Sequence, residues 1–196
     1  MNAVRRVTGR ALPLDRANVD TDQIIPAHWL KRVERTGYGA GLFEAWRRDP
    51  SFVMNDPRYA GASILIAGAN FGSGSSREHA VWALVEAGFR AVIAPGLADI
   101  FRANCLKSGL VPAEIEADAV TKLLRLVESD PRAEITVDVE RRAVEAPGVR
   151  TSFSLDEHAR TRLLEGLDDI AVTLAHADEI AQYESSRATW LPSLRD

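Results

Sequence analysis

Two continuous runs of apolar residues stand in the middle of the chain, and each precedes a segment with helical spacing. The runs are 62–67 and 91–94, and unbroken apolar runs of this length are typical of strands buried on both faces. The segments 76–89 and 97–107 repeat apolar residues at helical spacing, and Gly109 stands where a C-cap is expected. This strand–helix–strand–helix order predicts a parallel βαβα core in a layered α/β fold. The side chains expected to face the core are Ala80, Leu84, Ala87, Ile100, Phe101 and Cys105.

The sequence after this core indicates one more helix, a set of short strands and a helical tail. Residues 117–128 place their apolar side chains on one helical face. Apolar and polar residues then alternate with period two, which predicts an antiparallel meander. The strands are expected at 134–139, 143–145 and 149–153, and the tail helices around 156–166 and 176–185.

Residues 36–60 lack a clear period and predict a long irregular segment with one helical turn around 42–47. Segments of this length without regular structure are usually disordered or functional. Frequent aromatic residues argue against disorder. They are Tyr38, Phe43, Trp46, Phe52 and Tyr59. We therefore expect residues 1–196 to form a single α/β domain with a mixed sheet, an irregular loop at about 28–60 and a helical tail.

The composition is that of an ordinary globular protein. The chain has 196 residues, of which 46% are hydrophobic and 27% charged. A single cysteine, Cys105, excludes an internal disulfide and cannot by itself hold zinc or an iron–sulfur cluster. No histidine pair has metal-ligand spacing, and neither a signal peptide nor a membrane-spanning run is expected. These features predict a reduced, cytoplasmic protein with no metal of its own.

The charge is unevenly distributed. The net charge of −4 argues against nucleic-acid binding. Residues 1–112 carry 14 Lys and Arg against 10 Asp and Glu, whereas residues 113–196 carry 10 against 18. The first part could attract a small anion, but on charge alone an acidic, solvated C-terminal surface is the preferred explanation of this distribution.

The strongest candidate for chemistry is the glycine-rich segment 68–80, GANFGSGSSREHA, between a predicted strand and a helix. Glycines let backbone amides approach a ligand closely, and a helix N-terminus attracts negative charge. The segment lacks the third glycine of the dinucleotide fingerprint and the Gly-Lys-Ser/Thr of a P-loop. It therefore predicts an anion site of another kind.

Two interpretations compete for Ser75. With Glu78 three residues later, it matches a capping box, which would need no function. However, Ser76 and Arg77 follow directly, and the helix dipole opposes an arginine in a first turn. A bidentate carboxylate or phosphate ligand explains Arg77 better, so the site interpretation is preferred. His79 is expected to be a packed histidine.

A second candidate is the segment 18–26, NVDTDQIIP. Asp20 and Asp22 are either paired carboxylates for acid–base chemistry or capping residues of a turn. A basic cluster follows immediately. It consists of His28, Lys31, Arg32 and Arg35.

In these and three further stretches the chain resembles the small subunits of bacterial 3-isopropylmalate dehydratases. The stretches are GSGSSREHA, NVDTDQIIP, LKRVERTGYGAGLF, APGLADIFRANCLKSGL and GLDDIAVTLAHADEIAQYE. These subunits form the leucine-biosynthesis branch of the aconitase superfamily. The resemblance implies a swivel-type β/β/α domain that is half of an enzyme, a hydro-lyase that converts 2-isopropylmalate to 3-isopropylmalate by dehydration and rehydration. A separate large subunit would hold the [4Fe–4S] cluster.

The resemblance also implies residue roles. Ser75 would be the base that removes the proton alpha to a carboxylate of a small dicarboxylate substrate. Ser76, Arg77 and the loop around Gly74 would bind the substrate, and Arg32 would be a second substrate arginine. Thr21 and Asp22 would support the site without touching the substrate. The loop that begins at His28 would set substrate choice, with Leu30, Val33 and Leu42 as possible apolar contacts, and Ser73 stands where many relatives have cysteine.

Other functions remain open at this point. The same type of subunit could act on homoaconitate or a methylmalate-type diacid, and Arg32 and Arg35 would suit a third carboxylate. A non-catalytic anion-binding domain is a different class, in which Ser75→Ala would hardly change binding. A self-sufficient serine hydrolase would need a nucleophile elbow, which the sequence lacks.

Overall fold

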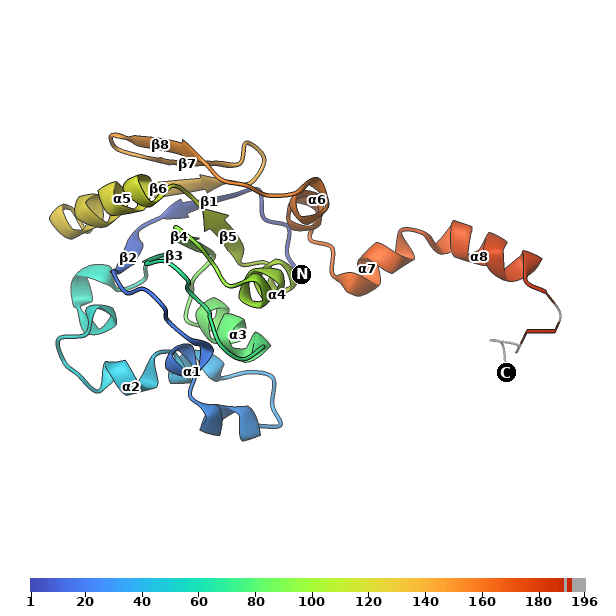
Figure 1. The fold of residues 1–196 in the computed structure, drawn as a ribbon, viewed down its shortest axis with the longest axis horizontal. Helices are drawn as coiled ribbons and strands as arrows, with labels where there is room; N and C mark the ends of the chain where they lie inside the picture. The colour runs from blue at the N-terminus through green and yellow to red at the C-terminus, as the bar shows by residue number, and fades with distance from the viewer. Residues whose placement is uncertain (189, 192–196) are drawn as a thin grey trace.

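The strands of the chain form two separate four-stranded sheets in this computed structural model, which describes residues 1–188, 190 and 191 (Figure 1). The first sheet is parallel, with the strand order β2-β3-β4-β5. Nearly all of its side chains are buried, because helices cover both faces. The strands are β2 Ala11–Leu14, β3 Ile64–Ala67, β4 Ala91–Ala94 and β5 Val111–Glu114.

The second sheet is antiparallel, with the order β1-β6-β7-β8. Its last three strands form the meander that the alternating pattern predicts, and its first strand comes from the beginning of the chain. The strands are β1 Arg6–Gly9, β6 Ile135–Asp138, β7 Ala143–Ala146 and β8 Val149–Ser152.

The α/β fold class and the parallel βαβα core are confirmed, but the expected mixed sheet is in fact two sheets. The chain leaves one sheet at Gly9 and enters the other at Ala11. Consecutive strands therefore pair with different partners, β1 with β6 and β2 with β3. The separation has a physical reason: a helix lies between the sheets, so their strands cannot share one ladder.

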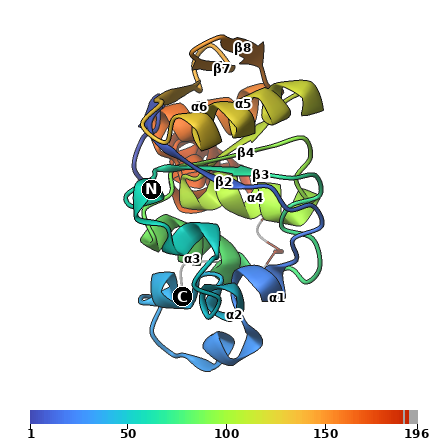
Figure 2. The same cartoon turned by 90° about the vertical axis from the view of Figure 1, so that its left-hand side faces the viewer.

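That helix is α5, Ala117–Ser129, which packs on β2, β3 and β4 on one side and on β8 on the other. Its buried residues are the ones that the sequence pattern predicts. They are Val120, Leu123, Leu124 and Val127. Figure 2 shows the resulting layers: the antiparallel sheet, α5 with α6, the parallel sheet, and then α4 and α3 on its opposite face. α3 spans Glu78–Glu86, α4 Asp99–Ser108 and α6 Glu157–Glu165.

The details of α4 confirm most of its sequence pattern. Phe101 and Cys105 are buried, and Gly109 caps the helix in the left-handed conformation with φ of 73°. Ile100, however, is 51% exposed, so the expectation that it faces the core is wrong. It immediately precedes the inward-facing Phe101, and a step of one residue turns a side chain by about 100° around a helix.

Residues 21–59 wrap below the parallel sheet as a series of short helical turns. They are α1 Thr21–Ile24, α2 Glu44–Arg47 and four 3₁₀ turns at Ala27–Lys31, Tyr38–Gly41, Val53–Asn55 and Pro57–Tyr59. The helical turn expected around 42–47 is confirmed as α2. Tyr38, Phe43, Phe52 and Tyr59 are buried, so the aromatic residues order this segment as expected.

The chain ends in a helical tail that leaves the layered body (Figure 1). The helices expected around 156–166 and 176–185 are confirmed as α6 and as α8, Ala177–Ser186. Between them lies α7, Asp169–Leu174, which the sequence pattern did not predict. That residues 1–196 form one domain stays a prediction, and its last part, residues 189 and 192–196, lies outside the described residues. Among residues 1–188, 190 and 191, no helix is both long and apolar enough to cross a membrane.

Candidate functional site

The two polar motifs meet at one edge of the parallel sheet. The motif at 18–26 follows β2, and the glycine-rich segment 68–77 follows β3. Because β2 and β3 are parallel neighbours, their carboxyl ends lie side by side. Main-chain hydrogen bonds then join the segments: Gly72 and Ser73 donate to the Val19 carbonyl at 2.8 and 3.2 Å, and the Thr21 N–H donates to the Ser73 carbonyl at 2.9 Å.

The side chain of Thr21 also anchors the glycine-rich loop. Thr21 is 2% exposed, and its hydroxyl donates to the Ser75 carbonyl at 3.1 Å. Gly72 and Gly74 have φ of 78° and 88°, the left-handed region that favours glycine. A Cβ at Gly72 would lie 2.2 Å from the Phe101 ring, so only glycine fits between the loop and α4. The loop is thus held in place while its outer surface stays open.

Ser75 and Ser76 lie on that open surface. Helix α3 begins at Glu78, its N-cap is Arg77, and no side chain caps it. The capping box proposed as an alternative for Ser75 and Glu78 is therefore wrong. Both serines are exposed, next to the exposed Gly74. Helix capping does not explain their presence.

Arg77 lies beside the loop, and the structure gives its guanidinium a partner. Nη1 of Arg77 donates to Oδ1 of Asp22 in an ion pair, with Arg77 17% and Asp22 54% exposed. Asp20 instead caps α1: it accepts from the Gln23 N–H at 2.8 Å, while the Gln23 side chain accepts from the Asp20 N–H at 2.9 Å. Asp20 also lies against the glycine-rich loop, where a Cβ at Gly74 would be 3.5 Å from the Cβ of Asp20. The carboxylate of Asp20 is engaged in the cap, however, whereas that of Asp22 pairs with Arg77.

His79 is a packed histidine, as expected. Its ring centre lies 5.2 Å from that of Tyr38 and 4.7 Å from that of Trp82. Burial lowers the pKa of His79 below its usual 6.5; Glu78 opposes this shift and Arg77 adds to it. The ring is therefore neutral at pH 7, and it joins the Tyr38 turn to α3.

Arg32 lies in the basic cluster, after the first 3₁₀ turn. Its guanidinium stands 5.3 Å over the Trp29 ring, and Nε1 of Trp29 donates to Glu44 at 2.5 Å. No motif in the sequence marks Trp29 and Glu44 as functional residues. Among the described residues, no hydrogen bond, ion pair or ring contact joins Arg32 to Ser75, Ser76 or Arg77.

The three apolar candidates of the loop differ in accessibility. Val33 is 93% exposed, Leu30 is half-buried and Leu42 is fully buried. Leu42 belongs to the core as the chain stands, whereas Val33 and Leu30 remain accessible.

The donor side chains of the described residues do not fit a metal cluster. Among the residues that the structure describes, no group of three His, Cys, Asp or Glu could hold a metal ion. Cys105 is fully buried, and burial raises the pKa of its thiol well above the usual range. A thiol that is neutral and inaccessible cannot ligate a cluster at the surface.

Comparison with known proteins decides the family. Residues 1–118 match the aconitase C-terminal domain, and residues 169–194 match the C-terminal domain of the 3-isopropylmalate dehydratase small subunit. The chain is 59% identical over 193 residues to the 3-isopropylmalate dehydratase small subunit of a Parafrankia species, covering 98% of this chain and 99% of that one. The chain belongs to the family of 3-isopropylmalate dehydratase small subunits. This makes it the small subunit of a hydro-lyase of leucine biosynthesis, with a large subunit as its partner.

Further small subunits of this family are similar to the chain over nearly its whole length. The small subunits of Streptomyces coelicolor and Rubrobacter xylanophilus are 58% and 54% identical over 192 residues, each covering 98% of both chains. The fold agrees with the crystal structure of 3-isopropylmalate dehydratase from Methanocaldococcus jannaschii, which has a TM-score of 0.65 at 24% identity and covers 90% of this chain and 98% of that one. The resemblance seen in the sequence is confirmed.

Proposed function

We propose that this chain supplies the base and a carboxylate-binding arginine for the isomerisation of 2-isopropylmalate to 3-isopropylmalate. The observation that carries the proposal is the junction of the two motifs. It leaves the Ser75 side chain exposed on a loop anchored by Thr21 and places the guanidinium of Arg77 beside that loop.

Ser75 is the candidate base for the proton alpha to the substrate carboxylate. A serine hydroxyl is a very weak acid, so its alkoxide needs strong electrostatic stabilisation. The open loop around Gly74 offers backbone amides, and the N-terminus of α3 and the Arg77 guanidinium add positive potential. The Ser75 carbonyl is held by Thr21, which orients the residue without engaging its side chain.

Arg77, together with Ser76, the exposed residue before it in the sequence, is the candidate clamp for a substrate carboxylate. A guanidinium has five N–H donors, and the ion pair with Asp22 uses one of its terminal nitrogens. The remaining donors suit a bidentate carboxylate, whose charge grows as the alpha proton leaves. Asp22 is a positioning residue, because it holds Arg77 toward the loop.

Arg32 is the candidate for the second carboxylate. Stacking on Trp29 restricts its guanidinium, and Glu44 fixes that ring in turn. Loop 28–60 would bring it to the substrate, with the exposed Val33 as an apolar contact. Arg35 is exposed in the same loop, and this observation supports homoaconitate, which has a third carboxylate, as an alternative substrate.

The large subunit completes the chemistry. Its [4Fe–4S] cluster, when bound, supplies the Lewis acid for the departing hydroxyl. We therefore expect the isolated chain to be inactive. We also infer a cytoplasmic location, which subcellular fractionation of the source organism would test.

The experiment follows the ultraviolet absorbance of the alkene diacid under anaerobic conditions. Activity with 2-isopropylmalate is expected only from the mixture of this chain with its cluster-loaded large subunit. Ser75→Ala should lower kcat of the mixture by about 10²–10⁴-fold, the usual contribution of a positioned base. Ser154→Ala, an exposed serine that follows β8, is the control and should leave kcat unchanged.

Three outcomes contradict the proposal. Dehydration by the pure chain would show that the partner is not needed. An inactive mixture with an intact cluster would indicate another diacid, to be tested with homoaconitate, or mere anion binding. Normal turnover of Ser75→Ala would remove Ser75 from the chemistry.

A further inference from the structure

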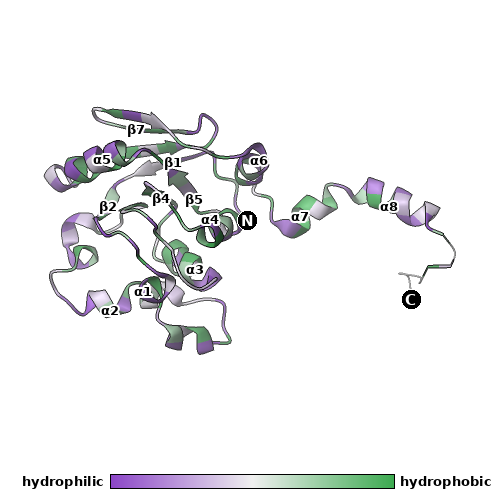
Figure 3. Cartoon of the chain, viewed as in Figure 1, coloured by the Kyte–Doolittle hydropathy of each residue, from purple (hydrophilic) through white to green (hydrophobic). Residues whose placement is uncertain are grey.

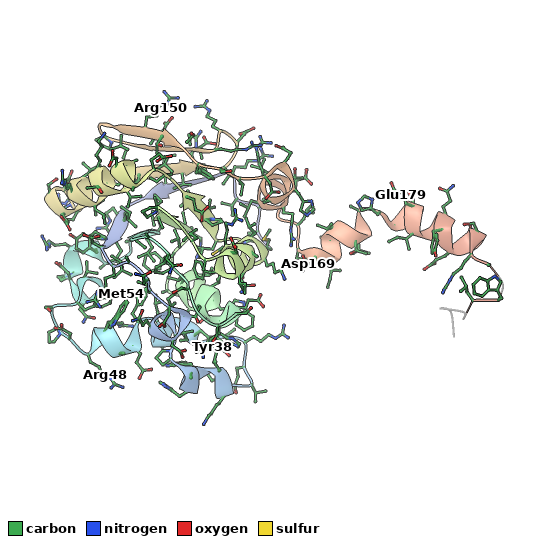
Figure 4. The ribbon with its side chains drawn as sticks, viewed as in Figure 1. Tyr38, Arg48, Met54, Arg150, Asp169 and Glu179 are labelled. Carbon is green, nitrogen blue, oxygen red and sulfur yellow. The ribbon has the colours of Figure 1, made fainter. Side chains whose placement is uncertain are left out.

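The tail from residue 168 to 187, here called the terminal arm, stands away from the body of the molecule. It contains α7 and α8, and none of the residues in these helices is buried. Figures 1 and 4 show it extending beyond α6, with Asp169 at its base and Glu179 far out. Contacts with the body occur at the base, where Asp169 pairs with Arg162 at 2.7 Å and with Lys107 at 4.0 Å.

The terminal arm and the residues just after it carry most of the exposed large apolar side chains. The described part of the chain exposes seven of these, and five of the seven come after residue 169. Those five are Ile170, Leu174, Ile180, Tyr183 and Trp190. Figure 3 shows hydrophobic and hydrophilic positions close together along α7 and α8, as in amphipathic helices. Apolar groups concentrated in this way mark an interaction surface.

The arm also needs a surface to pack against. α7 has six residues and α8 has ten, and isolated helices of these lengths are marginal in water. The capping bond from the Ala171 N–H to Asp168, at 2.8 Å, helps only the first turn. Packing of the apolar residues must supply the rest.

We propose that the terminal arm docks into an apolar groove of the large subunit and holds the two chains together. The site face must also approach the large subunit, whose cluster acts on the same substrate. Because Ser75, Ser76 and Asp22 on that face are polar and leave room for substrate, the apolar contacts of a stable interface must come from another part of the chain. A stable interface buries about 800 Å² per partner around an apolar centre. The arm and its end offer Tyr183 and Trp190, and aromatic side chains bury about 150–250 Å² each. An amphipathic helix laid into a groove is a recurring way to bind.

The charge of the terminal arm places a second requirement on the groove that would bind it. Five carboxylates and one guanidinium give the arm a net charge of −4. The groove should therefore have a basic rim, and association should weaken as salt rises. The carboxylates are Asp168, Asp169, Asp178, Glu179 and Glu184, and the guanidinium is Arg187.

The family comparison agrees with this role. The match to the aconitase C-terminal domain ends at residue 118, whereas the match that is particular to the dehydratase small subunits covers 169–194 and with it nearly the whole arm. A segment of this kind suits an enzyme whose two parts are separate chains. The proposal rests on membership in this two-subunit family and not on the roles proposed for Ser75 and Arg77.

The test measures the Kd between this chain and its large subunit by sedimentation, anaerobically. The double variant Leu174→Gln with Ile180→Gln keeps helix-forming residues and removes two apolar contacts. Each substitution is expected to raise Kd about 10-fold or more, so the double variant should raise Kd at least about 100-fold. The Tm of the isolated chain should not change, because both side chains are exposed. Ile100→Gln, an exposed isoleucine on α4, is the matched control and should leave Kd unchanged.

Hydrogen exchange gives an independent measurement. Amides of α7 and α8 should exchange fast in the isolated chain and become protected when the large subunit is added. Asp178→Asn with Glu179→Gln should flatten the dependence of Kd on salt.

The proposal is overturned if the apolar double variant binds the large subunit normally, or if the control variant weakens binding equally. It is also overturned if the double variant only turns a self-associated small subunit into a monomer, since the arm would then join two copies of this chain. Ser75→Ala separates the two proposals: it should lower kcat by about 10²–10⁴-fold and leave Kd unchanged.

Discussion

At the scale of single residues, the structure decides between interpretations that the sequence leaves open. The glycine-rich loop is recognisable in the sequence, because its composition is unusual. A capping box for Ser75 cannot be excluded from the sequence, because it depends on where the helix begins. Because Gly74 is in the left-handed conformation and Arg77 is extended, helix α3 begins only at Glu78. Ser75 therefore does not cap this helix. Nor could the sequence show that Arg77 has Asp22 as its partner.

The pairing of Arg77 and Asp22 leads to a graded prediction. Arg77→Lys replaces a planar fork by a point charge and should lower kcat/KM about 10–100-fold, the loss expected for a charge-assisted hydrogen bond. Asp22→Asn removes a half-exposed ion pair and should lower kcat/KM less, by up to about 5-fold. Steady-state kinetics of the complex with 2-isopropylmalate checks both values.

Arg102→Lys is the control for these variants, since Arg102 is an exposed arginine of α4 paired with Asp99. Its kcat/KM should be unchanged. If Arg77→Lys also kept near-normal kcat/KM, Arg77 would not be the carboxylate clamp.

At the scale of elements, the pattern of apolar residues identifies what is long or wholly buried. The central strands β3 and β4 and the helix α5 follow directly from it. β2 is wholly buried as well, but Pro13 stands inside it and Asp15 follows it, so turn residues hide this strand. β1 buries only one of its four residues. α7 has only six residues, fewer than two helical turns, so its apolar residues Ile170 and Leu174 are too few to show a helical period.

One buried carboxylate helps to hold the antiparallel sheet together, and this makes the stability of the sheet sensitive to acid. Asp138 on β6 is 4% exposed and accepts from the Arg6 guanidinium of β1 at 2.8 Å and from the Arg141 N–H at 2.9 Å. Burial alone would raise the pKa of Asp138, but these donors together lower it below 3.8. The carboxylate therefore stabilises the fold above about pH 4, and the contribution is lost as pH falls through the lower folded pKa.

Asp138→Ala should lower the free energy of unfolding at pH 7 by about 1–3 kcal/mol, because it leaves the Arg141 N–H unsatisfied. It should also weaken the pH dependence below about pH 4. Urea unfolding at several pH values measures both effects. Glu145→Ala is the control: its pair with Arg150 is exposed, and its loss should change stability by at most about 0.5 kcal/mol. Equal effects of the two variants would contradict this role of Asp138.

At the scale of the whole molecule, the site exists because of the strand order. Neither motif carries a signal that the other is near. They meet because β2 and β3 are parallel neighbours. In this topology the first strand of the chain, β1, belongs to the antiparallel sheet, and β2 pairs with β3 in the parallel sheet. A pattern along the chain shows which residues are buried, but it does not show which strands pair across long separations. The division into two sheets is therefore visible only in three dimensions.

The two sheets should nevertheless unfold together, because α5 packs on both. Leu123 is fully buried in this helix, within a single continuous core. Leu123→Ala leaves a cavity and should lower the free energy of unfolding by about 2–5 kcal/mol. Hydrogen exchange should show the same loss for the amides of β3 and of β6. Leu174→Ala, a leucine 66% exposed on α7, should change neither by more than about 0.5 kcal/mol. A loss confined to one sheet would mean that the two unfold independently, and then an acid-weakened antiparallel sheet could open while the site edge of the parallel sheet stays folded.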